Sequence, residues 1–96
     1  MFSWDAGKAL KNNEKHGVAF DEAATIFGDP EALEWEDLEH LAAERRWKRL
    51  GFSASGRVLI VVYTLRRLTH GTETIRIISA RQASRKEREA YAGHAD

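Results

Sequence analysis

The sequence contains no cysteine, a single proline and no long apolar run. Without cysteine there is no disulfide, thiolate nucleophile or thiol zinc site, and nothing indicates an oxidising compartment. The longest apolar run, Val58 to Tyr63, is far shorter than the roughly 20 residues that span a bilayer. Residues 1–10 lack the basic start and continuous apolar stretch of a signal peptide. We therefore expect a cytoplasmic protein with no membrane partner.

Net charge is also absent, but the charged residues are unevenly distributed. Met1 to Glu44 contain three basic and eleven acidic residues, whereas Arg45 to Asp96 contain twelve basic and four acidic ones. Ten of those twelve are arginine, whose planar guanidinium binds phosphate with two hydrogen bonds. The pattern favours a cationic face that binds nucleic acid. The alternative is that salt bridges join the two halves, either structurally or in an interaction domain whose halves neutralise each other.

The length of 96 residues predicts one domain over residues 1–96, large enough to form a hydrophobic core without disulfide bonds or a structural metal ion. The hydrophobic spacing predicts an N-terminal helical hairpin over residues 5–16 and 20–27, with Gly17 and Pro30 as the stops. Four mainly antiparallel strands follow at 33–36, 46–52, 58–63 and 74–80, and residues 2–4 are compatible with a short edge strand. Residues 84–87 form a capping box that opens a last helix to about residue 92. The fold class is α+β, with the strand at 58–63 central in the sheet because its apolar run is typical of burial on both faces.

Four ordered segments together resemble the BrnT family: residues 12–23 (NNEKHGVAFDEA), 40–51, 56–64, and 76–83 with Glu87, Arg88 and Tyr91 after them. The resemblance implies a RelE-like ribonuclease toxin of a bacterial type II toxin–antitoxin pair, which inhibits translation. It also implies a BrnA-like, ribbon-helix-helix antitoxin that neutralises the toxin in a hetero-oligomeric complex. Ala19 departs from the family, which often has a capping serine there, and Lys48 and Arg49 stand in a strand that is often apolar.

Metal-independent RNA cleavage needs a base for the 2′-hydroxyl proton, cations for the charge on the phosphoryl oxygens, and an acid for the leaving oxygen. Strand alternation places Arg76 on one face with Ile78 and Ala80, and Arg81 falls just beyond the strand end. We predict that Arg76 and Arg81 hold the phosphate. Further cations available to bind RNA are Arg57, Arg66, Lys15, Lys48, Arg49 and Arg88.

Four residues are candidates for proton transfer, and each has a structural alternative. His16 exchanges protons near neutral pH, but a histidine before a glycine at a helix end also hydrogen-bonds the last carbonyls. Glu87 is a candidate base that the capping box already explains, and Tyr91 is a candidate acid that could simply pack. His40 is a fourth candidate base or a residue of a solvated loop.

No metal or other cofactor is predicted. The carboxylates of residues 34–39 alternate along an apparent strand and so diverge to opposite faces, and no His or Cys spacing fits zinc. The rival to an enzyme is a non-catalytic RNA- or DNA-binding module that uses the same basic sheet face. Turnover separates the two, because a binder protects RNA stoichiometrically whereas an enzyme cuts it in trace amounts.

Overall fold

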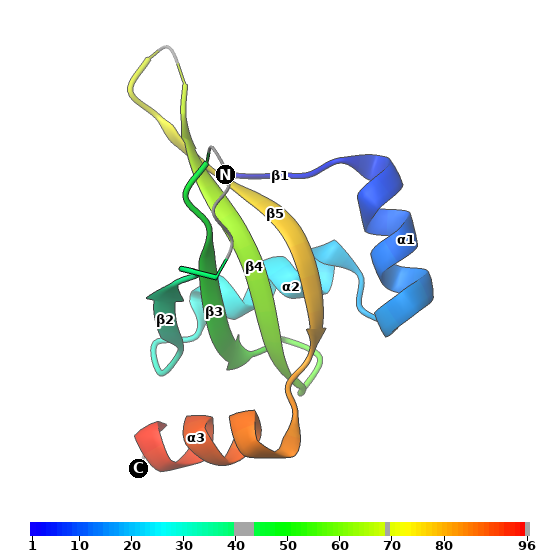
Figure 1. The fold of residues 1–96 in the computed structure, drawn as a ribbon, viewed down its shortest axis with the longest axis vertical. Coiled ribbons are helices and arrows are strands. Elements are labelled where there is room, and N and C mark those ends of the chain that lie inside the picture. The colour runs from blue at the N-terminus through cyan, green and yellow to red at the C-terminus, as the bar shows by residue number, and fades with distance from the viewer. Residues whose placement is uncertain (40–43, 69, 96) are drawn as a thin grey trace.

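The strands form one five-stranded sheet, with the helices packed around it (Figure 1). The computed structural model describes residues 1–39, 44–68 and 70–95. Its elements, in chain order, are β1 (Phe2–Ser3), α1 (Ala6–His16), α2 (Phe20–Thr25), the 3₁₀ turn η1 (Ile26–Gly28), β2 (Leu33–Glu36), β3 (Trp47–Phe52), β4 (Val58–Arg67), β5 (Glu73–Gln82) and α3 (Arg85–Ala95). Within this part of the chain, no helix is long and apolar enough to span a membrane.

The sheet order is β1-β5-β4-β3-β2, so the predicted central position of the apolar strand β4 is confirmed. The prediction of about four strands was incomplete, because β1 adds a fifth at the edge. It runs parallel to β5, with Phe2 opposite Ile75 and Ser3 opposite Arg76, whereas the other three pairings are antiparallel. A strand of two residues carries too little periodicity to be identified from the sequence alone.

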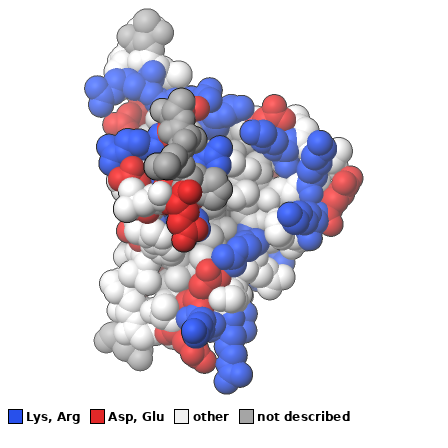
Figure 2. All heavy atoms as spheres, in the orientation of Figure 1, with Lys and Arg blue, Asp and Glu red and all other residues white. Residues whose placement is uncertain are grey.

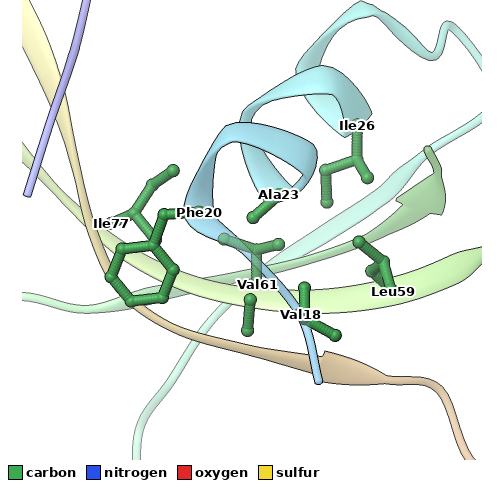
Figure 3. Close-up of a cluster of buried hydrophobic side chains, with 8 residues drawn as sticks. Val18, Phe20, Ala23, Ile26, Leu59, Val61 and Ile77 are labelled. Atoms are coloured by element: carbon green, nitrogen blue, oxygen red, sulfur yellow. The ribbon is translucent and has the colours of Figure 1, made fainter. Parts of the chain in front are cut away.

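The two N-terminal helices both contact β5, and α1 stands beside the edge of the sheet while α2 lies behind it (Figure 1). The predicted helical hairpin is therefore two helices held by the sheet. One buried cluster joins them to β4 and β5, comprising Val18, Phe20, Ala23, Ile26, Leu59, Val61, Ile77 and Ala80 (Figure 3). Burying each large aliphatic side chain of this cluster stabilises the fold by about 1.5–3 kcal/mol.

The predicted helix boundaries are confirmed at the start and end of α1 and at the start of α3. Asp5 accepts a hydrogen bond from the backbone N–H of Lys8 (2.9 Å), and Gly17 ends α1 with a φ of 67°. Ala19, at the start of α2, supplies no side-chain cap. At α3 the capping box forms, since Ser84 N–H donates to Glu87 (2.7 Å) and Glu87 N–H donates to the Ser84 hydroxyl (3.2 Å). The last helix continues to Ala95, further than predicted.

A second, smaller cluster lies under α3 on the opposite face of the sheet. It contains Leu50, Ile60 and Ala83, with Leu33, Val58 and Tyr91 packed against it. The Tyr91 hydroxyl also donates a hydrogen bond to Asp29 (2.6 Å), which anchors α3. Beyond α3, this face of β3, β4 and β5 carries no helix in the described part of the chain. We call it the open face.

A β-bulge in β5 decides which side chains reach the open face. Val62 pairs with Ser79 and Tyr63 pairs with Ile77, so Ile78 is an extra residue without a partner. The predicted alternation, with Arg76, Ile78 and Ala80 on one face, was wrong: Ala80 is buried in the cluster beneath α2. Because paired residues share a face, Arg76 opposite Thr64 and Arg81 opposite Ile60 both lie on the open face. Strict alternation would have separated them.

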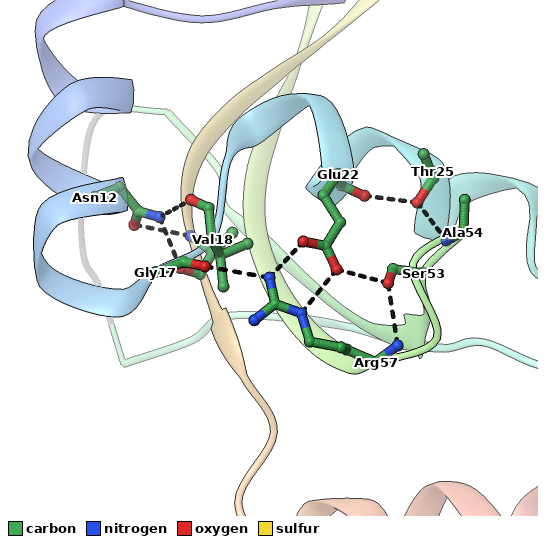
Figure 4. A network of polar contacts seen from close by, with 9 residues as sticks. Asn12, Gly17, Val18, Glu22, Thr25, Ser53, Ala54 and Arg57 are labelled. Carbon is green, nitrogen blue, oxygen red and sulfur yellow. Dashed lines mark hydrogen bonds and ion pairs between the residues drawn. The ribbon is translucent and has the colours of Figure 1, made fainter.

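The edge of β5 is bound to α1 through one buried side chain. The Asn12 amide donates to the carbonyl of Val18 (3.1 Å), as Figure 4 shows. It also donates to the Ala80 carbonyl (2.8 Å) and accepts from the Ala80 N–H (3.1 Å). The β5 edge needs such a partner here, because β1 pairs only with Ile75 and Arg76. His16 follows one turn later on the same side of α1. Asn12 therefore fixes where His16 lies.

Candidate active site

A hollow of about 250 Å³ on the open face brings together three of the predicted site residues. Its polar lining consists of His16, Lys48, Ser79 and Arg81, and we call it the His16 hollow. The three predicted residues come from the end of α1, from β3 and from β5, so only the folded sheet unites them. Ile60 and Val62 of β4 also line it. The arrangement places one imidazole and two cations around a shared space.

The imidazole of His16 makes no hydrogen bond or ion pair with any residue that the structure describes. The end of α1 is satisfied without it, because the Gly17 N–H donates to the Asn13 carbonyl (2.8 Å). The alternative role of His16, bonding the last carbonyls of the helix, is therefore not what the structure contains. Its side chain is half-buried at the hollow.

The guanidinium of Arg81 is held rigidly by Glu87. The two side chains form two hydrogen bonds of 2.8 and 2.9 Å, and Glu87 is itself fixed by Ser84. The hydrogen bond from Arg81 opposes the effect of burial and, with the bonds from Ser84, lowers the pKa of Glu87 to about 2. The same bond raises the pKa of Arg81 above its ordinary value. Glu87 is thus a weak base that orients a permanently charged Arg81.

Lys48 enters the His16 hollow from β3 without an ion-pair partner among the described residues. It pairs with Trp35 of β2 on one side and with Val62 of β4 on the other. Paired residues share a face, so the indole of Trp35 lies beside Lys48, and it is 41% exposed. Aromatic side chains of this kind stack on nucleic-acid bases. Sequence reasoning missed Trp35, although its alternation with Glu34 and Glu36 was a usable signal.

A second hollow, of about 210 Å³, lies further along the same face and contains the other open-face arginines. Arg66 and Arg76 line it together with Lys8, Arg46, Thr64 and Glu44, and we call it the Arg76 hollow. The sequence analysis predicted neither Lys8 nor Arg46 as a site residue. Arg76 pairs across the strands with Thr64, four residues along β4 from Ile60, the partner of Arg81. At about 3.3 Å per residue, the two arginines start about 13 Å apart.

The remaining predicted residues are not part of either hollow. Arg49 donates to Glu34 (2.8 Å) and lies over the Phe27 ring on the face covered by η1, and Arg57 is bound by Glu22 of α2 (Figure 4). Arg88 donates to the Ala83 carbonyl (2.8 Å), and Lys15 is exposed on α1. Tyr91 lines neither hollow, and its hydrogen bond to Asp29 raises the pKa of its hydroxyl to about 12. His40 lies outside the described residues.

Salt bridges between the two halves of the chain account for part of the uneven charge. Four pairs join the acidic half to the basic half: Glu22–Arg57, Glu34–Arg49, Glu36–Arg45 and Glu44–Arg66. The structural explanation of the charge pattern is therefore right for these arginines. Three basic residues on the open face, Arg46, Lys48 and Arg76, have no ion pair in the described part of the chain. Figure 2 shows Lys and Arg side chains spread over this side of the molecule, with Asp and Glu among them.

The described residues bring no three His, Cys, Asp or Glu side chains together as ligands for a metal ion. The charged side chains that line the His16 hollow, Lys48 and Arg81, are cations suited to an anionic ligand.

Comparisons with known proteins identify the fold and the family of the chain. A search among proteins of curated function found no significant match. The crystal structure of the Brucella abortus ribonuclease toxin BrnT shares the fold, with a TM-score of 0.63 and 24% sequence identity, over 88% of this chain and 99% of that one. The family described as "Ribonuclease toxin, BrnT, of type II toxin-antitoxin system" matches residues 4–87. The chain therefore belongs to the BrnT family of ribonuclease toxins of type II toxin–antitoxin systems.

Proposed function

We propose that this protein is a metal-independent endoribonuclease whose reaction takes place in the His16 hollow. The observation that carries the proposal is the convergence of His16, Lys48 and Arg81 from α1, β3 and β5 on one space. An imidazole and two cations are the groups that phosphodiester cleavage by the neighbouring 2′-hydroxyl requires. Membership of the BrnT family supports the ribonuclease activity, and the residues below are our own assignment.

In this mechanism His16 is the general base. Its imidazole takes the proton of the 2′-hydroxyl while the 2′ oxygen attacks phosphorus, and the bond from phosphorus to the 5′ oxygen breaks. The products are a 2′,3′-cyclic phosphate and a 5′-hydroxyl. Glu87 is unsuited to this step near neutral pH, because Arg81 keeps its pKa at about 2.

Arg81 stabilises the charge that develops on the phosphoryl oxygens. Its guanidinium is oriented before the substrate arrives, by two hydrogen bonds to Glu87, and preorganised donors contribute most to the transition state. Because Glu87 raises the pKa of Arg81 still further, Arg81 does not act as a proton donor. Lys48 is the other cation of the hollow, and we assign it the proton that the leaving 5′ oxygen takes up.

We infer metal independence from the side chains that line the hollow. Lys48 and Arg81 repel a divalent cation, and they supply the positive charge that a metal would otherwise bring to the phosphate. Cleavage should therefore survive an excess of EDTA and leave cyclic or 3′ phosphate ends. Loss of activity in EDTA, with recovery on adding Mg²⁺, would show that the mechanism is wrong.

As a toxin, the protein would inhibit translation by cutting RNA, and a BrnA-like ribbon-helix-helix antitoxin would neutralise it in a hetero-oligomeric complex. The family assignment supports a toxin–antitoxin pair, and the kind of antitoxin is part of the proposal. Expression of the chain alone should arrest bacterial growth, and co-expression of the antitoxin should restore it. Normal growth at confirmed soluble expression would count against a toxin.

Purified protein tests the catalytic proposal against its rival, a non-catalytic RNA- or DNA-binding module. Trace amounts should convert a labelled single-stranded RNA to discrete fragments over many turnovers. Arg81→Ala should lower kcat by about 10²-fold or more, the scale of losing one preorganised donor, and Arg81→Lys should restore only part of it. If the protein protects RNA only at a stoichiometric concentration and no fragments appear, the binding module is favoured. Arg85→Ala is the control, because Arg85 is exposed on α3 and pairs with Glu89.

A further inference from the structure

The Arg76 hollow holds more positive charge than its surroundings neutralise. Lys8, Arg46, Arg66 and Arg76 line it, and Glu44 is the one carboxylate of the lining in the described residues. Glu44 pairs with Arg66 at 3.1 Å, so it is already engaged. The undescribed residues 40–43 have the sequence HLAA and contribute no carboxylate. Three cations of the hollow therefore have no ion-pair partner among the described residues.

Another acid, Asp5, interacts with the charges of Lys8 and Arg76 but does not neutralise them. Asp5 caps α1, and the hydrogen bond from the Lys8 backbone is the main reason that its pKa is lowered, with smaller effects from the charges of Lys8 and Arg76. Asp5 is fully committed to the helix end, and neither side chain forms a salt bridge with it. Arg76 is half-buried, and a partly desolvated cation without a partner is unfavourable unless an anion binds.

A buried hydroxyl at the same hollow is also without a partner. Thr64 is 3% exposed and lines the hollow, and its Oγ1 makes no hydrogen bond within the described structure. An unpaired buried hydroxyl costs about 1–3 kcal/mol. The hydroxyl of Thr74 is also buried without a partner in the described structure, and each such group needs an explanation such as a bound water or ion or a functional role.

We propose that the Arg76 hollow is a phosphate subsite that binds the RNA backbone beside the bond to be cut. The inference rests on the proposed function, since it takes the His16 hollow as the site of cleavage. The arginines of the two hollows start about 13 Å apart along one strand pair, which is further than one phosphodiester group extends. The two hollows therefore bind different phosphates of one RNA strand lying along β4 and β5. Arg76 binds substrate and does not touch the reacting phosphate.

This subsite makes cleavage depend on the length of the substrate. A dinucleoside monophosphate can occupy the His16 hollow alone, whereas an oligonucleotide of about ten nucleotides can reach both hollows. Wild-type protein should therefore have the higher kcat/KM on the oligonucleotide. Arg76→Ala and Arg46→Ala should each lower the ratio of kcat/KM on the oligonucleotide to kcat/KM on the dinucleotide by about tenfold, mainly by raising KM for the oligonucleotide. A tenfold change is the scale of one charge-assisted hydrogen bond. Arg85→Ala, outside both hollows, should keep the preference.

Binding gives a second readout that does not depend on activity. The probe is a fluorescent oligonucleotide of the same length with 2′-O-methyl groups, which cannot be cut. Arg76→Ala should weaken its binding about tenfold and reduce the slope of log affinity against log salt by about one. Circular dichroism of each variant checks that the fold is retained.

The outcomes separate failure of the subsite from failure of the proposed function. If wild-type protein cuts neither RNA yet Arg76→Ala weakens binding of the uncleavable probe, the proposed function is wrong while the hollow still binds RNA. If Arg76→Ala lowers kcat equally on both substrates, Arg76 acts at the reacting phosphate and the subsite is overturned. The subsite is also overturned if Arg76→Ala leaves the affinity for the RNA probe unchanged. If the same variant then binds an acidic peptide more weakly than wild-type protein does, the hollow binds protein and not RNA.

Discussion

Replacement of Asn12 by alanine should destabilise the protein far more than its position on a helix suggests. Asn12 is 8% exposed, and its amide satisfies two carbonyls and one N–H, those of Val18 and Ala80. Both backbone segments are buried, so removing the amide leaves three buried polar groups without partners. Each such group costs about 1–3 kcal/mol, and water entering beside α1 keeps the total toward the low end. We expect a loss of about 2–4 kcal/mol in the free energy of unfolding.

Asn13→Ala is the matched control, because Asn13 is exposed on the same helix and its side chain makes no hydrogen bond in the described structure. Both substitutions gain the higher helix propensity of alanine, about 0.5 kcal/mol, so that effect cancels in the comparison. Urea unfolding followed by circular dichroism gives the two free energies. A difference below about 1 kcal/mol would refute the structural role of Asn12. Under conditions where Asn12→Ala is folded, RNA cleavage should also fall, because His16 is no longer held in place.

Two further predictions concern α3. The pKa of Glu87 is lowered to about 2 from 4.5, so the stabilisation from its pair with Arg81 is fully present above about pH 4.5 and is lost as the pH falls through 2. Arg81 is 42% exposed, so solvent screens part of this interaction. Glu87→Gln should therefore lower the free energy of unfolding by about 1 kcal/mol at pH 6 and have almost no effect near pH 2, as measured by urea unfolding across that range. An equal loss at both pH values would contradict the ion pair. Tyr91→Phe should lose about 1 kcal/mol of stability through the Asp29 contact with little change in cleavage rate, and a rate loss of about 10²-fold would show that Tyr91 is the general acid.

The sequence predicts most of the regular structure because the signals are local. Asp5 and Gly17 mark the ends of α1, the apolar run identifies the central strand, and Ser84 with Glu87 opens α3. The parallel strand β1 was only suggested, because its pairing with β5 joins the start of the chain to residues 75 and 76. Such distant pairing leaves no period in a two-residue segment.

The candidate site was harder to predict, because it depends on irregular features and on tertiary contacts. The bulge at Ile78 reverses the faces of the following residues and brings Arg81 to the same side as Arg76, which a period-two pattern cannot reveal. Whether an arginine is engaged by a carboxylate is also a tertiary property. Arg57 and Arg76 were both predicted from the sequence as cations that bind RNA. Glu22 binds Arg57, whereas Arg76 makes no ion pair in the described part of the molecule.

The central claim is that His16 removes the proton of the 2′-hydroxyl in the hollow that it shares with Lys48 and Arg81. The most direct measurement is the rate of cleavage of one defined RNA by His16→Ala at saturating substrate, beside the control His94→Ala on the exposed side of α3. Loss of a general base should lower kcat by about 10²-fold or more in a folded variant, whereas the control should match the wild-type rate. Full activity of folded His16→Ala would contradict the account, because His16 is the residue to which the account assigns that proton among the described side chains that line the hollow.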